Sequence, residues 1–373
     1  MQPLQGIKVL DFSTLLPGPL ATLLLAEAGA QVTKIERPGV GDESRLFAPK
    51  LGGASISFAL LNRGKRSIAL DLKAAEALAQ LMPLLREADV LVEQFRPGVM
   101  ERLGLGYEHV KALNPKIVYC SITGFGQSGP KAQVAAHDLN YLADTGMLAL
   151  AAGVDGAPVV PPALIADIAG GAYPAMMNIL LALRQRDRTG EGCWLDVSMS
   201  DNLFPLMYWG LGAGAALGAW PRSGGEMLTG GSPRYQIYRT KDDRFVAAGP
   251  LEERFWQTFC EVINLPAALR NDAVDARATQ AAVAQIIRGD TAATWRERFA
   301  GRDACTVVVA SLEEAARDPH FVARGLFDHR IALAGRELPA MPVPVSDQFR
   351  GAPSETIGFP ALGGANELLS KQR

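Results

Sequence analysis

The sequence predicts an α/β protein in which a large doubly wound domain with a mostly parallel sheet precedes a smaller α+β domain. Three observations predict this fold class. Short β-rich runs alternate with helix-like runs over the first 125 residues, eight of the 22 residues from 210 to 231 are glycine, and a hairpin pattern followed by an amphipathic helix comes after them. Strands separated by helices require right-handed crossovers, which make the neighbouring strands parallel.

The elements of the large domain, residues 1–205, follow in order along the chain. We expect a first strand at 7–12 and then a helix at 17–28, which has prolines near its start and Gly29 as its C-terminal stop. The other elements are predicted from alternating apolar residues in strands and from helical spacing of apolar residues in helices. They are strands at 31–35, 67–70, 90–92 and 116–121 and helices at 74–86 and 175–186.

The second half of the chain differs in composition and in its pattern of predicted elements. Residues 206–232 are expected to form a flexible glycine-rich linker. The smaller α+β domain is assigned to 233–325, because a hairpin with strands at 234–238 and 245–248 precedes an amphipathic helix at 251–263. A proline-rich stretch near the C-terminus predicts an extended tail.

Composition and charge exclude several classes of protein. Lys and Arg total 37 against 39 Asp and Glu, a net charge of -2, which disfavours a nucleic-acid partner. The four cysteines form no CxxC pair and have no metal-type spacing, so no metal site is predicted. The longest apolar window, 163–183, contains Asp167 and Pro174, which argues against a membrane span. The chain opens on a strand rather than a signal peptide, so we expect a cytoplasmic protein.

A strand, turn and helix at the N-terminus raises the possibility of dinucleotide binding. The turn after the first strand, 13–19, contains prolines and no GxGxxG motif, which disfavours a nicotinamide cofactor. Basic residues instead recur where the early strands end, and together they could hold a polyphosphate by charge-assisted hydrogen bonds. For any single one of them, a solvated surface position is the simpler interpretation. These residues are Arg37, Arg63, Lys65, Arg66, Lys73, Arg96 and Arg102.

Three acidic positions and one histidine are candidates for chemistry. Asp167 lies in an apolar run beside two glycines, where a carboxylate is costly unless it is used or hydrogen-bonded. It could bind a ligand, which the glycines would allow to approach closely, or cap the following helix. His137 and Asp138 follow a glycine-rich loop. Glu252 begins a helix, where complementing the helix dipole is the simpler interpretation.

A series of ordered motifs resembles the family III CoA-transferase and α-methylacyl-CoA racemase superfamily over essentially the whole chain. The resemblance implies a Rossmann-like large domain, a C-terminal segment, 326–373, that returns to it, and two chains interlocked as a homodimer. It also implies an acyl-CoA thioester as partner, with coenzyme A part of the substrate and no other cofactor. The matching segments are 9–13, 16–19, 34–38, 62–66, 70–73, 95–98, 102–106, 124–130, 136–141, Asp167 with Gly170 and Gly171, and 249–252.

The resemblance leaves three functions open. In the racemase branch, the histidine matching His137, assisted by Glu252, and the aspartate matching Asp167 act on opposite faces of the substrate α-carbon. In the transferase branch Asp167 would be a nucleophile that forms a mixed anhydride with the acyl group. His137 before Asp138, and Glu252 where transferases have a glycine-rich loop, favour the racemase of 2-methylacyl-CoA. A non-catalytic acyl-CoA-binding protein is the third possibility.

Two departures from the racemase pattern bear on the fit of the acyl chain. Ala136 stands where racemases usually have glycine, and two glycines rather than three follow Asp167. The resemblance implies His137, Asp138, Asp167 and Glu252 as catalytic residues. The positions that it implies for binding CoA are Arg37, Leu70, Asp71, Leu72, Lys73, Gln94, Phe95, Arg96, Arg102, Ala136 and Tyr141.

Overall fold

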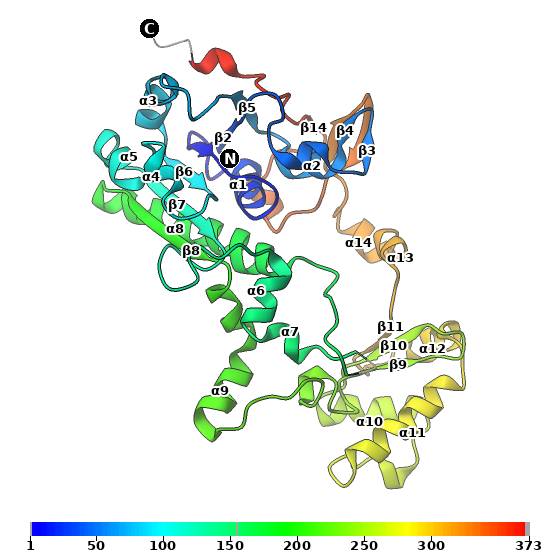
Figure 1. Cartoon of the computed structure of the whole chain (residues 1–373). Coiled ribbons are helices and arrows are strands. Elements are labelled where there is room, and N and C mark those ends of the chain that lie inside the picture. The colour runs from blue at the N-terminus through cyan, green and yellow to red at the C-terminus, as the bar shows by residue number, and fades with distance from the viewer. Residues whose placement is uncertain (1, 154–155, 370–373) are drawn as a thin grey trace. The chain divides into compact units, whose positions relative to one another are not determined.

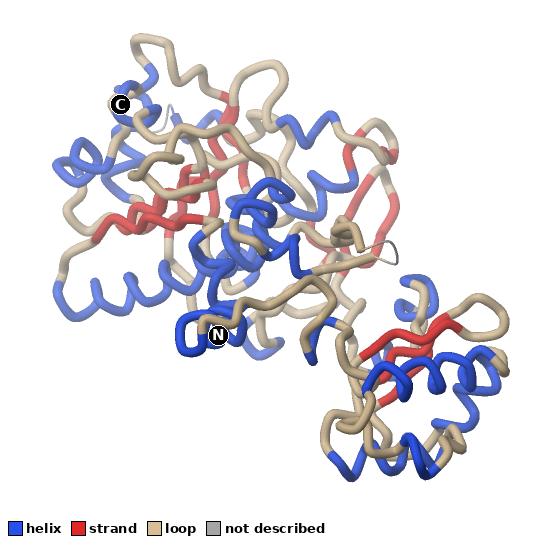
Figure 2. Tube along the Cα trace, turned by 60° about the horizontal axis from the view of Figure 1, so that its bottom comes forward, coloured by secondary structure: helices blue, strands red, loops and turns tan. Residues whose placement is uncertain are grey.

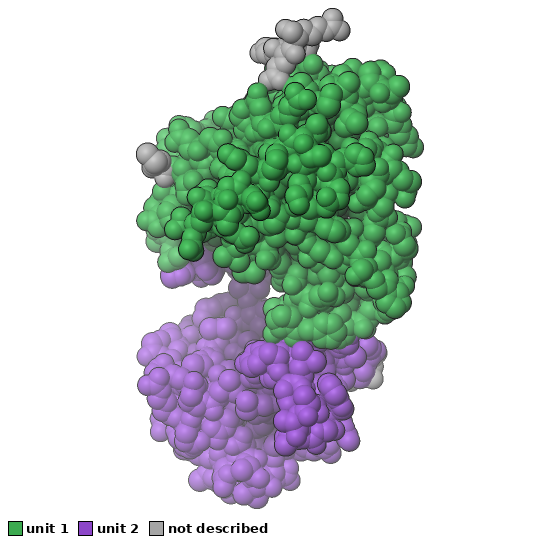
Figure 3. Space-filling view, turned by 90° about the vertical axis from the view of Figure 1, so that its left-hand side faces the viewer, with its two compact units in different colours: residues 1–145, 161–206, 322–373 green, residues 146–160, 207–321 purple. Residues whose placement is uncertain are grey.

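The computed structural model describes residues 2–153 and 156–369, which form two compact units. Unit 1 comprises Met1–Thr145, Pro161–Leu206 and Val322–Arg373, and unit 2 comprises Gly146–Val160 and Met207–Phe321 (Figure 3). The chain passes between the units after residues 145, 160, 206 and 321, so neither unit is one contiguous segment. Residues 146–160, which the sequence assigns to the large domain, cluster with unit 2.

Unit 1 is built on a six-stranded sheet with the order β5-β2-β1-β6-β7-β8 (Figure 1). Every pairing in this sheet is parallel, which confirms the predicted large parallel sheet. The strand order reverses between β1 and β6, and ligands of open α/β sheets bind at the carboxyl ends of strands at such a point. The strands are β1 (Lys8–Asp11), β2 (Gln31–Glu36), β5 (Arg66–Ala69), β6 (Val90–Glu93), β7 (Val118–Thr123) and β8 (Cys193–Ser198).

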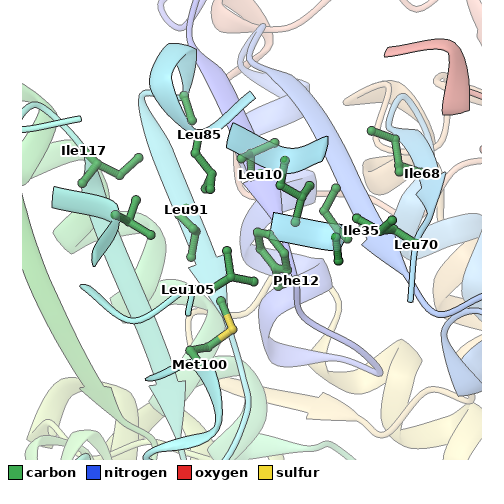
Figure 4. Packing of buried hydrophobic residues seen from close by; sticks show 14 of the residues in the cluster. Leu10, Phe12, Ile35, Ile68, Leu70, Leu85, Leu91, Met100, Leu105 and Ile117 are labelled. Atoms are coloured by element: carbon green, nitrogen blue, oxygen red, sulfur yellow. The ribbon is translucent and has the colours of Figure 1, made fainter. Parts of the chain in front are cut away.

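Helices cover both faces of this sheet, as Figure 2 shows. The helices α1 (Pro17–Glu27) and α8 (Tyr173–Thr189) pack together on one face. The opposite face is covered by α3 (Ala77–Glu87), α4 (Val99–Arg102) and α5 (Tyr107–Leu113). Residues from the strands, from these helices and from their connections form the core on this second face (Figure 4), among them Leu10, Phe12, Ile35, Ile68, Leu70, Leu85, Leu91, Met100, Leu105 and Ile117.

The remaining elements of unit 1 lie in its long connections and in its C-terminal part. The carbonyl oxygen of Ser67 accepts the N–H of Ala365 at 2.8 Å, which joins the C-terminal segment to the edge strand β5. These elements are β3 (Lys50–Leu51), β4 (Ala54–Ser55), α2 (Ile56–Asn62), α6 (Asp138–Asp144), a π-helical turn (Ala166–Ala172), β12 (Arg330–Leu333), β13 (Arg336–Pro339) and β14 (Thr356–Ile357); α14 (Pro319–Ala323) begins in unit 2 and ends in unit 1.

Unit 2 has its own antiparallel sheet, of order β11-β10-β9, covered by helices. The predicted hairpin is present, and Trp256, Phe259 and Trp295 fill the core on the helical side of the sheet. The ring centroids of Trp256 and Phe259 stack 5.5 Å apart. The elements are α7 (Met147–Leu150), α9 (Tyr208–Leu217), β9 (Gln236–Arg239), β10 (Phe245–Ala248), α10 (Glu253–Val262), α11 (Ala276–Arg288), α12 (Ala292–Phe299), β11 (Thr306–Val308) and α13 (Leu312–Ala316).

The glycine-rich stretch differs from the flexible linker expected over 206–232. Residues Tyr208–Leu217 form the helix α9. Gly214 is buried on this helix, and a Cβ at this position would collide with the ring of Trp220. At least this glycine therefore provides room for close packing of an aromatic side chain.

The π-helical turn and α8 run together from Ala166 to Thr189, a length and composition that would suffice to cross a membrane. In unit 1 one side of this segment lies in the core, where Ala175, Ile179 and Ala182 are buried. The segment contacts α1, β7 and β8, and it serves as a packing element of the sheet.

Two buried ionic clusters stabilise the centre of unit 1. They contain Lys65 and Arg63, two of the residues that the sequence analysis considered as phosphate ligands. Lys65 Nζ lies 3.1 Å from Asp11 Oδ2, and Lys34 Nζ lies 3.0 Å from Asp42 Oδ2, with all four side chains fully buried. Burial alone would raise the pKa of Asp11, but the charges of Lys34 and Lys65 and hydrogen bonds from Ser13 and Thr22 hold it far below its usual range. Lys65 is therefore a structural residue.

Arg63 is a structural residue as well. Its guanidinium lies 2.7 Å from Glu27 Oε1, and Arg350 approaches the other oxygen of Glu27 at 2.8 Å. The sequence did not reveal that these basic side chains point into the core.

Candidate active site

A cavity of about 360 Å³ lies at the reversal point of the unit 1 sheet. Residues that follow strands β1, β6 and β7 line it, together with the start of α6 and the π-helical turn. Its walls contain predicted site residues from three segments that are distant in the sequence. The predicted residues that line it are Gln94, Phe95, Arg96, Ala136, His137, Tyr141 and Asp167.

His137 is held at the edge of this cavity as the residue that precedes α6. Its backbone is extended, with φ -127° and ψ 176°, and its N–H donates to Asn140 Oδ1 at 3.0 Å. The imidazole is exposed rather than packed into the core. Tyr141, one turn along α6, donates its hydroxyl to the carbonyl oxygen of Ala136 at 2.9 Å. These contacts fix the backbone on both sides of His137 and leave the ring accessible to a ligand.

Asp167 lies in the π-helical turn, a distortion that is frequent at functional sites. The helical segment begins at Ala166, before Asp167, so the alternative that Asp167 caps the following helix is wrong. A Cβ at Gly170 would collide with the carbonyl oxygen of Met199. Gly170 therefore lets the turn pack against the backbone after β8, which is a different role from the ligand approach that we expected.

Asp138 connects the two helical segments that carry His137 and Asp167. The carboxylate of Asp138 is buried, and its Oδ1 accepts the backbone N–H of Asp167 at 3.0 Å. Burial, and then the charge of Asp138, raise the pKa of Asp167 to about 7. Asp167 can consequently hold or release a proton at neutral pH, as a general acid or base requires.

A second, larger cavity of about 720 Å³ adjoins the first, and Phe95 lines both. Charged side chains at its rim include Arg37, which is exposed and lies 3.4 Å from Glu43 Oε1. The predicted binding positions are therefore divided between two adjoining spaces in unit 1. Those that line the second cavity are Arg37, Leu70, Asp71, Leu72, Lys73, Phe95 and Arg102.

Glu252 and Arg66 lie elsewhere. Glu252 precedes α10 in unit 2, where it is exposed and its side chain makes no capping hydrogen bond, whereas His137 and Asp167 belong to unit 1. Arg66 extends from the edge strand β5 and donates to Thr33 Oγ1 at 3.1 Å. Within residues 2–153 and 156–369, no group of three or more His, Cys, Asp or Glu side chains is placed to hold a metal ion.

Sequence reasoning missed several apolar residues of the first cavity, notably Leu15, Phe125 and Met199. Leu15 has φ +65°, a left-handed conformation that is rare for leucine, and its N–H donates to the buried carboxylate of Asp42 at 3.2 Å. Each of the three follows soon after a strand of the parallel sheet. That position was the available signal, because loops at the carboxyl ends of such strands form the ligand site.

Comparison with known proteins gives concordant matches across the chain. A family model described as CoA-transferase family III matches residues 4–365. Human alpha-methylacyl-CoA racemase is 36% identical, over 95% of this chain and 92% of that protein. Acetyl-CoA:oxalate CoA-transferase of Acetobacter aceti is 33% identical, over 99% and 95%. The crystal structure of a CAIB/BAIF family protein from Brucella suis superposes with a TM-score of 0.82 at 26% identity, covering 99% of this chain and 98% of that one.

Proposed function

The chain belongs to CoA-transferase family III, and from this premise we propose that it is a racemase or epimerase of 2-methylacyl-CoA thioesters. The observation that carries the proposal is the presence of His137 and Asp167 in one cavity, with the pKa of Asp167 near 7. An imidazole and a carboxyl group of this kind can exchange one proton with the substrate α-carbon without a metal or redox cofactor.

The proposed reaction is a 1,1-proton transfer through an enolate. One group of the pair removes the α-proton, the C–H electron pair moves into the thioester as an enolate, and the other group delivers a proton to the opposite face. The enolate oxygen needs a hydrogen-bond donor. The N–H of Asp167 is already donated to Asp138, so we assign this role to the first backbone N–H of α6, that of Asp138. The assisting role that the resemblance implies for Glu252 stays a prediction, because Glu252 belongs to unit 2.

The CoA moiety is proposed to occupy the second cavity, with its thioester end in the first. Arg37, Lys73 and Arg102 supply the positive charge that the phosphates of CoA require. Phe95 and Arg96 would contact the part of CoA that passes from one cavity to the other.

A CoA-transferase is the second candidate, because transferases are among the relatives at similar identity and Asp167 could act as a nucleophile. Incubation of wild-type protein with one enantiomer of a 2-methylacyl-CoA in deuterated water separates the two. A racemase incorporates deuterium at the α-carbon and loses stereochemical purity without an acid acceptor. An acyl adduct on Asp167 that hydroxylamine traps, with no deuterium exchange, would contradict the racemase.

The pH dependence of kcat/KM is expected to be bell-shaped for a racemase. The His137–Asp167 pair must hold one proton, so activity falls at low pH, when both groups are protonated, and at high pH, when neither is. Because Asp167 has a pKa of about 7, it should contribute to the transition near neutral pH. A nucleophilic aspartate needs only to be ionised, so a rate that rises through pH 7 to a plateau would indicate the transferase. Initial rates between pH 5 and pH 9 make this measurement.

We also propose a homodimer. Tyr173, Met177 and Leu181 of α8 are exposed, and residues of α8 line an apolar groove of about 500 Å³ with Leu24 and Pro344. An exposed apolar surface of this kind is typical of an interaction site. Sedimentation equilibrium at micromolar concentration should give twice the mass of one chain. A well-folded monomer under these conditions would contradict the proposal.

A further inference from the structure

Glu93 is a buried carboxyl group that the proposed reaction does not use. It ends strand β6 and is 4% exposed. Its Oε2 accepts the backbone N–H of Phe95 at 2.8 Å, so it is bonded to the turn that follows the strand. Glu93 itself lines neither cavity, whereas Gln94, Phe95 and Arg96 all line the first and Phe95 lines the second as well.

The turn that carries these three residues has a second anchor. Gln94 Oε1 accepts the N–H of Gly18, in the first turn of α1, at 3.0 Å. Through Glu93 and Gln94 the turn is therefore fixed both to its own strand and to the neighbouring helix. Phe95 directly follows these two residues, and its own N–H is held by Glu93.

The groups around Glu93 penalise its ionisation. Burial contributes most, and two carboxylates face it, Glu101 from α4 and Asp196 from β8. Hydrogen bonds from the Ser121 hydroxyl and the Phe95 N–H act in the opposite direction and lower the pKa of Glu93. The Ser121 oxygen also accepts the indole N–H of Trp194 at 3.0 Å, and Tyr119 and Cys120 lie close by. The net effect raises the pKa of Glu93 to about 7.

We propose that Glu93 is a positioning residue for CoA. Through its hydrogen bond to the backbone of Phe95, Glu93 holds in place the wall that the two cavities share. The proposal rests on CoA as the ligand of these cavities, but it is independent of the choice between racemase and transferase. A carboxylate accepts this N–H more strongly than a neutral carboxyl group does. CoA should therefore bind more tightly when Glu93 is ionised.

Stability of the fold should change in the opposite direction. The pKa of Glu93 is higher in the folded protein than in the unfolded chain, so the fold loses stability as pH rises from the ordinary value of 4.5 to about 7, and above that pH the loss is complete. Glu93→Gln keeps a hydrogen-bond acceptor of the same size but remains neutral at every pH. Above pH 7 this variant should therefore be more stable than the wild type while binding CoA less tightly.

The experiment is calorimetric titration of free CoA into the wild type and Glu93→Gln between pH 6 and pH 8.5, with thermal unfolding at the same pH values. At pH 6 the two proteins should bind CoA equally. At pH 8.5 the variant should bind about fivefold more weakly, the difference expected between a charged and a neutral acceptor. Its unfolding temperature at pH 8.5 should exceed that of the wild type. Asp167 is present in both proteins and the same CoA is titrated into each. The titration of Asp167 and of the CoA phosphates therefore cancels in the ratio of the wild-type affinity to the variant affinity.

Two further variants serve as controls. Glu101→Gln removes a carboxylate that faces Glu93 and leaves Phe95 unchanged. The pH at which the CoA affinity changes should therefore be lower than in the wild type. The affinities well below and well above this pH should equal those of the wild type. Arg37→Ala should weaken CoA binding at every pH and leave the pH dependence in place.

A constant ratio of affinities between wild type and Glu93→Gln across the pH range would overturn the proposal. So would a Glu93→Gln variant whose unfolding temperature and CoA affinity both fall at pH 8.5, because that result indicates a packing role alone. A folded wild type that does not bind CoA at all would overturn the proposed function itself, which is a distinct result.

Discussion

Asp167→Asn is expected to lower the rate of α-carbon epimerisation by at least about a thousandfold, since the variant loses one of the two groups that move a proton. Binding of acyl-CoA should remain nearly intact. Asparagine has the same shape, and the hydrogen bond to Asp138 comes from the backbone of residue 167, which the substitution keeps. The assay is loss of stereochemical purity of one enantiomer in deuterated water, with binding measured separately by titration.

The enantiomer that still exchanges its α-proton in this variant is an additional signature of the two-base reaction. His137 remains in the Asp167→Asn variant, so slow exchange of the α-proton should persist for one enantiomer only. Asp144→Asn is the matched control, because Asp144 is an exposed residue at the end of α6 that pairs with Lys131. Its activity should equal that of the wild type. A trapped acyl adduct on Asp167, with full CoA transfer by His137→Ala, would establish the transferase instead.

Lys65→Met is expected to lower the free energy of unfolding by about 3–5 kcal/mol, the usual cost of breaking a buried ion pair from one side. The Lys65 ammonium contacts Asp11 Oδ2, Thr22 Oγ1 and Asn62 Oδ1 at 2.8–3.1 Å. Methionine fills the volume but leaves the buried Asp11 carboxylate without its nearest cation. Urea unfolding at a fixed protein concentration measures the loss.

Lys8→Met is the control for this substitution. Lys8 pairs with Glu87 at 2.7 Å, but both side chains are 47% exposed, and an exposed pair contributes at most about 1 kcal/mol. Equal losses for Lys8→Met and Lys65→Met would contradict the structural role assigned to the buried cluster.

The sequence predicted five of the six strands of the unit 1 sheet, because they alternate with helices and carry apolar residues at the expected spacing, but it missed the edge strand β8. Glycine content over 210–231 was misleading, since composition cannot distinguish a flexible chain from a helix that accepts a tryptophan ring at Gly214. Packing of that kind depends on residues that are neighbours only after folding.

For the site, the family resemblance implied that His137 and Asp167 act on one substrate carbon, and both residues line the same cavity. Basic residues in the same region were not equivalent, because Arg63 and Lys65 neutralise buried carboxylates while Arg37 lines a cavity. Charge alone does not show which way a side chain points. The left-handed backbone of Leu15 was likewise invisible, because it depends on Asp42, 27 residues away.

The discontinuous make-up of unit 1 has a consequence for how the protein is synthesised. Glu27 pairs with Arg350 across 323 positions of the chain, and Ser67 bonds to Ala365. When the ribosome has completed most of the polypeptide, Glu27 can pair with Arg63 but still lacks Arg350, and the edge of β5 still lacks Ala365. Unit 2, whose main part is a single run from Met207 to Phe321, is complete before that segment emerges. Unit 1 therefore stays incomplete until the segment that begins at Val322 has been made, and a partly synthesised chain exposes surface that favours aggregation.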